Sequence, residues 1–420
     1  MESLLHYVWK QKLYSNTNMF TTDGIAIEVI DPGVHNKDAG PDFFNAKLRI
    51  GDKIWAGNVE IHLNTSDWNK HKHHQDKAYD SVILHVVERK DISCVKDTND
   101  RVVPEWIMSV PQTIKDKFDY LLNVDIPIPC LDRIRHIDSI YLSDWMSALL
   151  SERLERKTNT ILQLLDTYNN DWNEVFYITL SRNFGFGINN DVFERLAKSL
   201  PLKIIHKHAD SRAQVEALFF GQAGLLSETI EDDYYNVLKK EYLFLKNKYS
   251  LQPLDSYLFK SLRIRPNNFP HVKIAQLASI VSSGQHLLSK ILAINNPSYY
   301  STVFITSLPE YWNTHYAFGT ESINKPKSLG TSSIHILLIN TVAPLLFAYG
   351  KLKESVAYMD RAFTLLEILP PEKNFITKDF LLGGLSCKSA ADSQSMIQLK
   401  REYCEKKKCM YCRIGYKVLL

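Results

Sequence analysis

Two carboxylates and a histidine are spaced so that a fold could gather them around one divalent cation. Asp42 follows Pro41 at the start of a strand-like run, and Glu60 and His62 lie two positions apart in the next run. Alternate side chains of a strand share a face, so Glu60 and His62 point the same way and an adjacent strand could bring Asp42 to them. Paired carboxylates repel each other unless a cation lies between them, and Mg²⁺ or Mn²⁺ prefers such oxygen ligands.

A cation held in this way would activate water beside a phosphodiester. It would polarise the phosphoryl oxygen and lower the pKa of the attacking water. His62 would then orient that water, relay its proton or complete the coordination. The residues therefore predict hydrolysis of a phosphodiester bond in DNA or RNA, with Asp42, Glu60 and His62 as the catalytic residues.

Histidines are concentrated around this set. Five of the 14 histidines lie between positions 62 and 85, namely His62, His71, His73, His74 and His85. Neutral imidazole is a ligand for zinc, nickel or iron, and His62 and His85 on neighbouring strands could join Glu60 at one metal. Zinc or nickel is therefore the alternative to Mg²⁺ or Mn²⁺. The competing interpretation places His71, His73 and His74 in a solvated helix or loop and makes His85 a hydrogen-bonded sheet residue.

The C-terminal cysteines form a second candidate metal site. Four of the six cysteines lie near the end of the chain, at Cys387, Cys404, Cys409 and Cys412. The Cys409–Cys412 pair, with Gly415 after it, is typical of a tight turn that directs two thiolates at one cation, as in structural zinc sites. An iron–sulfur cluster on the same four thiolates is the alternative. Cys94 and Cys130 are predicted to be buried or incidental.

The cysteines are surrounded by positive charge, which would suit contact with a nucleic-acid backbone. The nearby basic residues are Lys400, Arg401, Lys406, Lys407, Lys408, Arg413 and Lys417. The alternative is a solvated helix end whose lysines face the negative end of the helix dipole.

Hydrophobic periodicity predicts the elements that would position the acidic residues. It predicts a helix at 2–14, strands at Ile25–Ile30, Phe43–Ile50 and Ile54–Leu63, a short helix within 64–80 capped near Ser66, and a central strand at Ser81–Glu88. Gly51-Asp52 is the expected turn of a hairpin between the second and third strands. The predicted order of elements is therefore αβββαβ.

Gly40-Pro41-Asp42, the hairpin and Glu60-Ile61-His62, within residues 2–88, resemble the signature of the PD-(D/E)XK nuclease superfamily. The resemblance implies a restriction-endonuclease-like module in which Asp42 and Glu60 bind the metal. It also implies that the Ile61 carbonyl is a possible third ligand and that Glu2 or His6 approaches the site. His62 stands at the family's lysine position. A catalytically inactive nucleic-acid-binding or scaffold protein is therefore one alternative function, and a small-molecule hydrolase with a histidine-rich site is another.

From about residue 138 the pattern becomes helical, so the fold class is α+β: an N-terminal αβββαβ module, a mostly α-helical region and a C-terminal four-cysteine clamp. The predicted domains are 1–90, a connection at 91–137, a helical region at 138–380, and a C-terminal helix with the cysteine site at 381–420. Ser143 is expected to cap a helix running to Leu165, Asp171 with Glu174 to form a capping box, and residues 376–403 to form one helical stretch. Over its whole length the chain also resembles an uncharacterised family of bacterial proteins, which implies no mechanism.

Composition supports a folded protein. The 420 residues are 45% hydrophobic and 23% charged, and the formal net charge of +3 is too small to identify a polyanion-coating protein. Residues 1–12 lack the pattern of a signal peptide, and the apolar run Ile334–Tyr349 is too short to span a bilayer, so the expected location is cytoplasmic without a membrane partner. No Walker, Rossmann, zinc-protease or nucleophile-elbow motif is present. The sequence predicts no oligomeric state.

Overall fold

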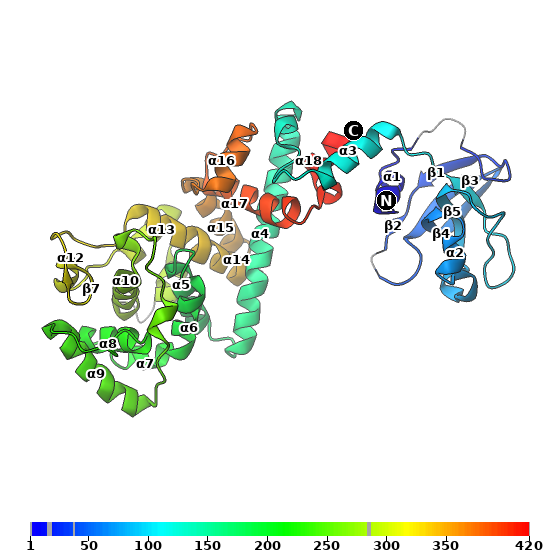
Figure 1. The fold of residues 1–420 in the computed structure, drawn as a ribbon. Coiled ribbons are helices and arrows are strands. Elements are labelled where there is room, and N and C mark those ends of the chain that lie inside the picture. Colours follow the sequence, from blue (N-terminus) through cyan, green and yellow to red (C-terminus); the bar gives the residue numbers. More distant parts are fainter. Residues whose placement is uncertain (1, 15–18, 37, 284–286, 420) are drawn as a thin grey trace. The chain divides into compact units, whose positions relative to one another are not determined.

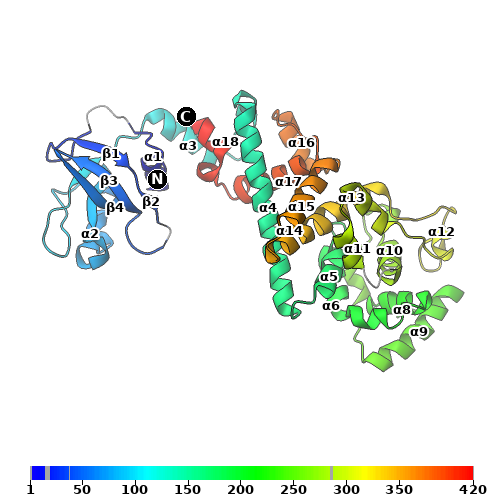
Figure 2. The ribbon, with the colours of Figure 1, turned by 180° about the vertical axis from the view of Figure 1, so that it is seen from behind.

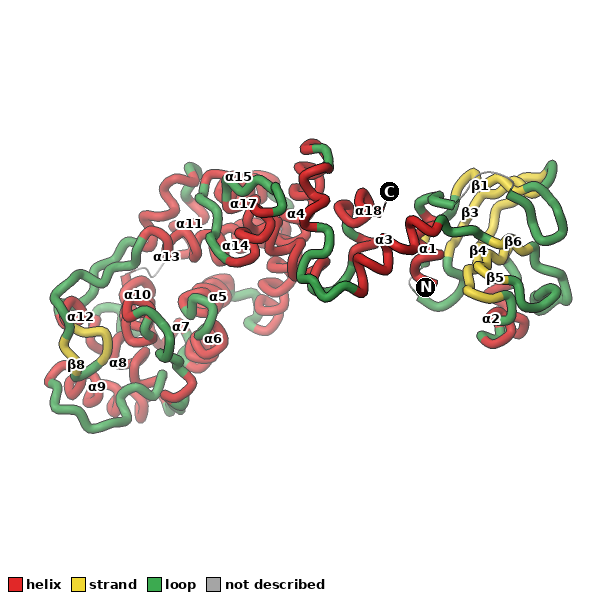
Figure 3. The backbone as a smooth tube through the Cα atoms, turned by 45° about the horizontal axis from the view of Figure 1, so that its top comes forward, coloured by secondary structure: helices red, strands yellow, loops and turns green. Residues whose placement is uncertain are grey.

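The computed structural model describes residues 2–14, 19–36, 38–283 and 287–419. The chain forms two compact units, one made of residues 1–137 and 402–420 and the other of residues 138–401. Strands β1 to β6 all lie in the first unit, whereas the second is almost entirely helical (Figure 3). The expected mixture of an N-terminal sheet and a mostly helical remainder is confirmed.

The first unit is built on one mixed sheet. Its elements are α1 (Glu2–Lys10), β1 (Ile27–Asp31), β2 (Val34–His35), β3 (Phe43–Ile50), β4 (Lys53–Asn64), α2 (Asp67–Lys70), β5 (Val82–Arg89), β6 (Glu105–Ile107), α3 (Gln112–Asn123) and α18 (Arg413–Leu419). The strand order is β1-β3-β4-β5-β6, with β2 paired to β3. The pairs β1·β3 and β3·β4 are antiparallel, whereas β4·β5 and β5·β6 are parallel.

Local sequence explains this core. Gly51, with φ of 61°, makes the turn between β3 and β4, where Ile50 pairs with Lys53. Helix α1 packs on β4 and buries its apolar residues Leu4, Leu5, Val8 and Trp9. Six consecutive residues of β5, Val82–Val87, are buried, as expected for a strand covered on both faces.

The structure differs from the predicted elements at three places. The helix predicted at 2–14 ends at Lys10, because Lys12 adopts a left-handed backbone and donates its ammonium to the carbonyls of Val29 and Ile30. Ser66 does not cap α2 with its side chain, since its hydroxyl donates to Asp91 instead. The connection predicted at 91–137 contains β6 and α3.

Both strand pairs of β4 are irregular close to the candidate site. The register shifts between Phe43 and Ala46 in the β3·β4 pair and between Asn58 and Val59 in the β4·β5 pair. Such bulges bend a strand and redirect its side chains. Here they lie next to Asp42, which directly precedes β3, and to Glu60, which lies within β4.

The second unit is a helical assembly (Figure 1). Its α-helices are α4 (Ser139–Thr167), α5 (Trp172–Phe184), α6 (Asn190–Ser199), α7 (Leu202–His206), α8 (Arg212–Gln222), α9 (Asp233–Tyr249), α10 (Pro270–Ser283), α11 (Leu287–Ala293), α12 (Tyr311–Thr314), α13 (Thr331–Leu337), α14 (Ala343–Leu352), α15 (Val356–Ile368), α16 (Phe375–Leu382) and α17 (Ala390–Gln398). A two-stranded ribbon joins β7 (His315–Ala317) to β8 (Thr320–Glu321). Figures 1 and 2 show the long α4 lying against α14 and α17.

Three helix predictions in this unit are wrong in detail. Ser143 lies inside α4, which begins at Ser139. Asp171 does cap α5, but the Glu174 carboxylate accepts from the Leu202 N–H instead of returning to Asp171, so no reciprocal capping box forms. The helix predicted at 376–403 is interrupted at Gly384, whose φ of 97° ends the helical path.

One helical stretch among the described residues is long and apolar enough to cross a membrane by length and composition alone. It spans Thr331–Leu352 and includes the run Ile334–Tyr349, which taken alone is too short to span a bilayer. In the structure, most of this stretch is buried inside the protein. The stretch therefore packs as part of the helical core.

We expect Gly57→Ala to weaken the β4·β5 pair. A Cβ at position 57 would collide with Ile83 Cγ2 and lie 2.8 Å from the Ser81 carbonyl oxygen. Overpacking of this kind costs about 1–3 kcal/mol. Native-state hydrogen exchange of the β4 and β5 amides should show that loss of protection. The control Ala56→Ser adds one atom at the neighbouring exposed position and should leave protection unchanged; equal losses in both variants would contradict the explanation.

Candidate metal centre

Asp42 and Glu60 converge where β3 and β4 diverge from regular pairing. The Asp42 N–H donates to Glu60 Oε2 over 3.1 Å, and the Ile61 N–H donates to Asp42 Oδ2 over 2.9 Å. Each carboxyl is therefore tied to the backbone of the other's segment. The structure brings these two predicted residues together.

The environment of Glu60 disfavours its charge. Its side chain is only 6% exposed. Burial, reinforced by the negative charge of Asp42, raises the pKa of Glu60 to about 9, although the Asp42 N–H and His6 oppose the shift. At neutral pH this carboxyl therefore binds a proton or requires a nearby cation.

His6 on α1 contacts the same pair of segments. Its Nε2 lies 3.2 Å from Asp42 Oδ2, and its ring also hydrogen bonds to the backbone of Ile61. Burial lowers the pKa of His6, but the hydrogen bond and charge of Asp42, with Glu2, outweigh it and raise the pKa overall. The first helix thus brings His6 to the side chain of Asp42.

His62 is completely enclosed by polar neighbours. Its side chain is 1% exposed, with Nε2 3.4 Å from Glu60 Oε1 and 3.1 Å from His71 Nδ1. Burial, followed by the charges of His85, His73 and His71, lowers the pKa of His62 to about 2. The imidazole is therefore neutral at pH 7 and cannot supply the positive charge of a lysine at this position.

His85 and Glu105 continue the row behind His62. Across three strands, Glu60 is the register partner of His85, and His85 is the partner of Glu105. His85 Nε2 lies 2.9 Å from His62 Nδ1, and His85 Nδ1 lies 3.2 Å from Glu105 Oε2. The structure thus places His85 behind His62, in contact with His62 Nδ1. It also places Glu105 next to His85, a residue that the sequence analysis did not identify.

His71 and His73 face β4 from the segment that follows α2. Lys72 between them has a φ of 64°, which reverses the chain locally. His73 is 7% exposed, stacks on Tyr79 at a centroid distance of 3.7 Å and lies with Nε2 3.2 Å from Glu60 Oε1. The donor atoms of His62, His71 and His73 all lie within 4.8 Å of one another. The solvated-loop interpretation is therefore wrong for His73, and His71 is exposed but directed toward His62.

A cleft of about 210 Å³ opens beside His6. It is lined by residues of α1, by His35 and by the C-terminal segment: Ser3, His6, Tyr7, Lys10, Gln11, His35, Met410 and Tyr411. Its charge-bearing groups are Lys10 and imidazoles. This cleft gives a polar ligand room next to His6, which in turn contacts the Asp42 carboxylate.

The first unit also contains a thiol cluster with an unexpected member. Burial, and then the charges of Cys412 and Cys409, raises the pKa of Cys130 to about 12. Burial and then Cys412 raise the pKa of Cys409 to about 11. Cys130 is therefore buried as predicted, but it is not incidental, because it lies close to the C-terminal pair.

The remaining cysteines occupy different environments. Cys404 belongs to the first unit, whereas Cys387 belongs to the second, where burial and then Asp392 raise the pKa of its thiol to about 11. Cys94 is exposed. Gly415 packs on the carbonyl oxygen of Cys409 and leaves no room for a side chain, so it fixes the turn that carries Cys409 and Cys412.

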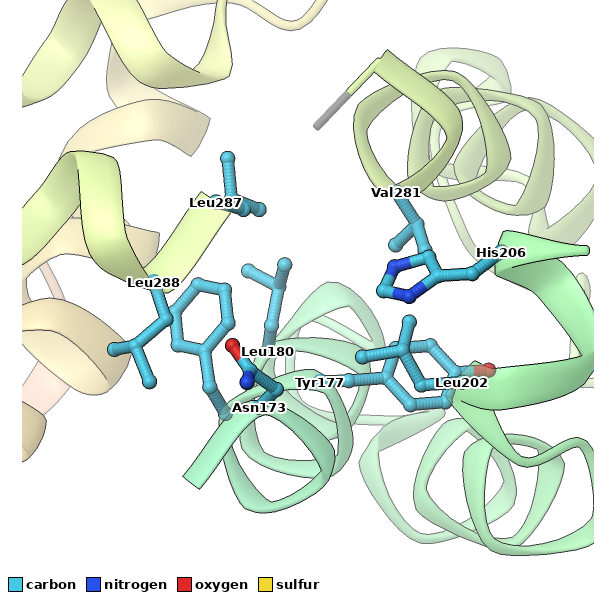
Figure 4. A pocket seen from close by; sticks show the side chains of 9 residues that line it. Asn173, Tyr177, Leu180, Leu202, His206, Val281, Leu287 and Leu288 are labelled. Carbon is cyan, nitrogen blue, oxygen red and sulfur yellow. The ribbon is translucent and has the colours of Figure 1, made fainter. Parts of the chain in front are cut away.

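The helical unit has a separate small cavity (Figure 4). Leucine, valine and aromatic side chains form most of its wall, with Asn173 and His206 as its polar members. Its volume of about 20 Å³ suffices for roughly one water molecule. It therefore offers no room for a substrate.

Comparison with known proteins identifies the family alone. No curated protein and no solved structure matches the chain. A family model described as "Protein of unknown function (DUF2851)" matches residues 2–375. Because that match covers most of the chain, the protein belongs to the DUF2851 family.

Proposed function

We propose that the first unit is a divalent-cation-dependent hydrolase of phosphodiester bonds in DNA or RNA. The convergence of Asp42 and Glu60 carries the proposal: two carboxyls from adjacent strands meet where the charge of one raises the pKa of the other. A dication removes that repulsion, and its oxygen ligands suit Mg²⁺ or Mn²⁺.

The topology supports the resemblance to PD-(D/E)XK nucleases. Helix α1 precedes three antiparallel strands, β1, β3 and β4, and the segment containing α2 leads to β5, which lies parallel to β4. Asp42 precedes β3 and Glu60 lies within β4, which are the positions that the predicted αβββαβ order gave to these two residues. This agreement argues for a nuclease-like module with two additional short strands, β2 and β6.

Several residues of the site have roles in the proposed reaction. Asp42 and Glu60 would hold the cation, which when bound polarises a phosphoryl oxygen and acidifies water. His6, at 3.2 Å from Asp42, is placed to exchange a proton with a water or leaving group in the cleft. Lys10 supplies the permanent positive charge that neutral His62 lacks, from the wall of the same cleft.

Neutral isosteres test the carboxyl pair. We expect Asp42→Asn and Glu60→Gln each to lower Mn²⁺-dependent cleavage of DNA or RNA by about a hundredfold or more. Because glutamine mimics the protonated Glu60 and asparagine at position 42 removes the charge that opposes ionisation of Glu60, thermal stability of the cation-free protein should not fall. Cleavage is measured on gels with single- and double-stranded substrates in Mg²⁺, Mn²⁺, Zn²⁺ and Ni²⁺.

Glu28→Gln is the matched control, because Glu28 is an exposed carboxylate of the same sheet that pairs with Arg49. It should keep full activity. Cleavage at the wild-type rate by Asp42→Asn or Glu60→Gln would disprove the mechanism. Salt-sensitive binding without cleavage in any cation would instead favour the alternative of an inactive nucleic-acid-binding protein. That alternative rests on the neutral state of His62.

We also propose that Cys130, Cys404, Cys409 and Cys412 bind one structural zinc ion, with an iron–sulfur cluster as the alternative. The charges of Cys409 and Cys412 affect the pKa of Cys130, and Cys412 affects that of Cys409, which supports these three members of the set. Cys404 is included on its spacing to Cys409 and Cys412 in the sequence. The cation would hold the segment that contributes Met410 and Tyr411 to the cleft.

Elemental analysis of purified variants tests this set. Cys130→Ser should lose about one equivalent of bound metal and unfold at a lower temperature, because a structural metal site contributes folding free energy. Cys387→Ser is the control and should keep the metal. Iron with sulfide in the wild-type protein would identify a cluster, whereas metal loss in Cys387→Ser but not in Cys130→Ser would overturn the assignment.

A further inference from the structure

We infer that Glu60, His62, His71 and His73 form a second cation site, adjacent to the carboxylate pair, that binds a borderline transition-metal dication such as zinc. The site goes beyond the proposed hydrolysis, because it rests on the arrangement of nitrogen donors and not on any reaction.

Three imidazole donor atoms lie close together, and Glu60 contacts two of them. Glu60 Oε1 lies 3.4 Å from His62 Nε2 and 3.2 Å from His73 Nε2, and His62 Nε2 lies 3.1 Å from His71 Nδ1. The three imidazole donors fall within 4.8 Å of one another. Separations a little over 3 Å are those expected between ligand atoms that each lie about 2.0–2.2 Å from a shared zinc ion.

The contacts behind His62 allow the tautomer that a ligand needs. His85 Nδ1 lies 3.2 Å from Glu105 Oε2, an ion-pair distance without hydrogen-bond geometry, so a proton on Nδ1 faces the carboxylate and leaves Nε2 unprotonated. In that tautomer His62 donates from Nδ1 to His85 Nε2, which leaves its own Nε2 lone pair directed at Glu60 Oε1 and His71 Nδ1. A metal-bound histidine commonly donates its other ring N–H to a supporting acceptor, and His85 Nε2 is that acceptor here.

His73 supplies an independent observation. Its Nε2 is buried and makes no hydrogen bond among the described residues, although it faces Glu60 Oε1 at 3.2 Å. Stacking on Tyr79 and edge contact with Trp68 hold the ring in this orientation. A buried polar atom without a hydrogen bond costs stability, and a cation at this position would satisfy it.

The donor set determines the class of metal. Three neutral imidazoles and one carboxylate suit zinc and neighbouring first-row dications, whereas Mg²⁺ prefers oxygen ligands and retained waters. His62 and His73 are buried, but His71 is exposed, so an ion can enter and leave from its side. The other oxygen of Glu60, Oε2, accepts from the Asp42 N–H and therefore lies on the side of Asp42.

Zinc binding by the full-length protein tests the inference without substrate. Metal-free protein is titrated with Zn²⁺ against a chromophoric chelator. Loss of an outer hydrogen-bond partner of a metal ligand typically lowers the metal affinity about 10–100-fold. Because His71→Ala removes a ligand itself, we expect it to weaken one zinc site by about a hundredfold or more. Co²⁺ at that site should give visible bands of nitrogen–oxygen coordination that His71→Ala loses.

His74→Ala is the matched control, because His74 lies in the same turn but its ring contacts Gln75. It should bind zinc as the wild type does. Equal zinc affinity in His71→Ala and wild-type protein, or equal losses in His71→Ala and His74→Ala, would overturn the site. Since His71 is exposed, its replacement should leave the circular dichroism and melting of the metal-free protein unchanged.

The contact between Glu105 and His85 has its own test. Glu105→Leu should weaken the same zinc site about 10–100-fold, and Glu105→Gln, which keeps an acceptor for His85, should restore part of that affinity. If the wild-type protein binds zinc through these histidines but cleaves no phosphodiester in any cation, only the proposed function is rejected. Cleavage by Mn²⁺-loaded protein in the absence of a histidine-dependent zinc site would reject this inference alone.

Discussion

The burial of the Glu60 carboxyl is the constraint on which the first unit's arrangement depends. A carboxylate removed from water is costly unless hydrogen bonds or opposite charges compensate it. Around Glu60 the chain supplies one backbone donor, from Asp42, and two imidazole contacts, from His62 and His73. The irregular register of β4, the left-handed Lys72 and the stacking of His73 on Tyr79 all serve to bring those groups to it.

Sequence patterns predicted the elements whose causes are local. Alternating apolar residues and the Gly51-Asp52 turn placed β3 correctly and β4 within one residue at each end. The ends of helices were less predictable because distant partners decide them. Lys12 ends α1 by binding carbonyls of β1, and Asp91 takes the hydroxyl of Ser66 away from α2. Neither partner is visible in the local sequence around those helices.

The residues of the candidate site also divide into those whose position local sequence determines and those whose position depends on other parts of the fold. Period-two spacing was enough to place Glu60 and His62 on one face, and the strand order brought Asp42 to them. Spacing could not place His71 and His73, because a positive φ at Lys72, a residue that seldom adopts one, sets their directions. Cys130 was beyond prediction for another reason: Cys409 and Cys412, whose charges affect it, are about two thirds of the chain away in sequence, and residues 402–420 join the first unit only in the fold.

The two sides of Glu60 differ chemically, and this bears on how two cations could share it. Oε2 belongs to an oxygen-rich side with Asp42, whose side chain is 22% exposed, and Oε1 belongs to a nitrogen-rich side that is mostly closed. Hard cations with retained water suit the first, and borderline cations suit the second. One carboxylate cannot neutralise two dications, so filling one side opposes filling the other until a further anion arrives. A phosphodiester in the neighbouring cleft would be such an anion, and substrate binding would then strengthen cation binding by the same factor that the cations strengthen substrate binding.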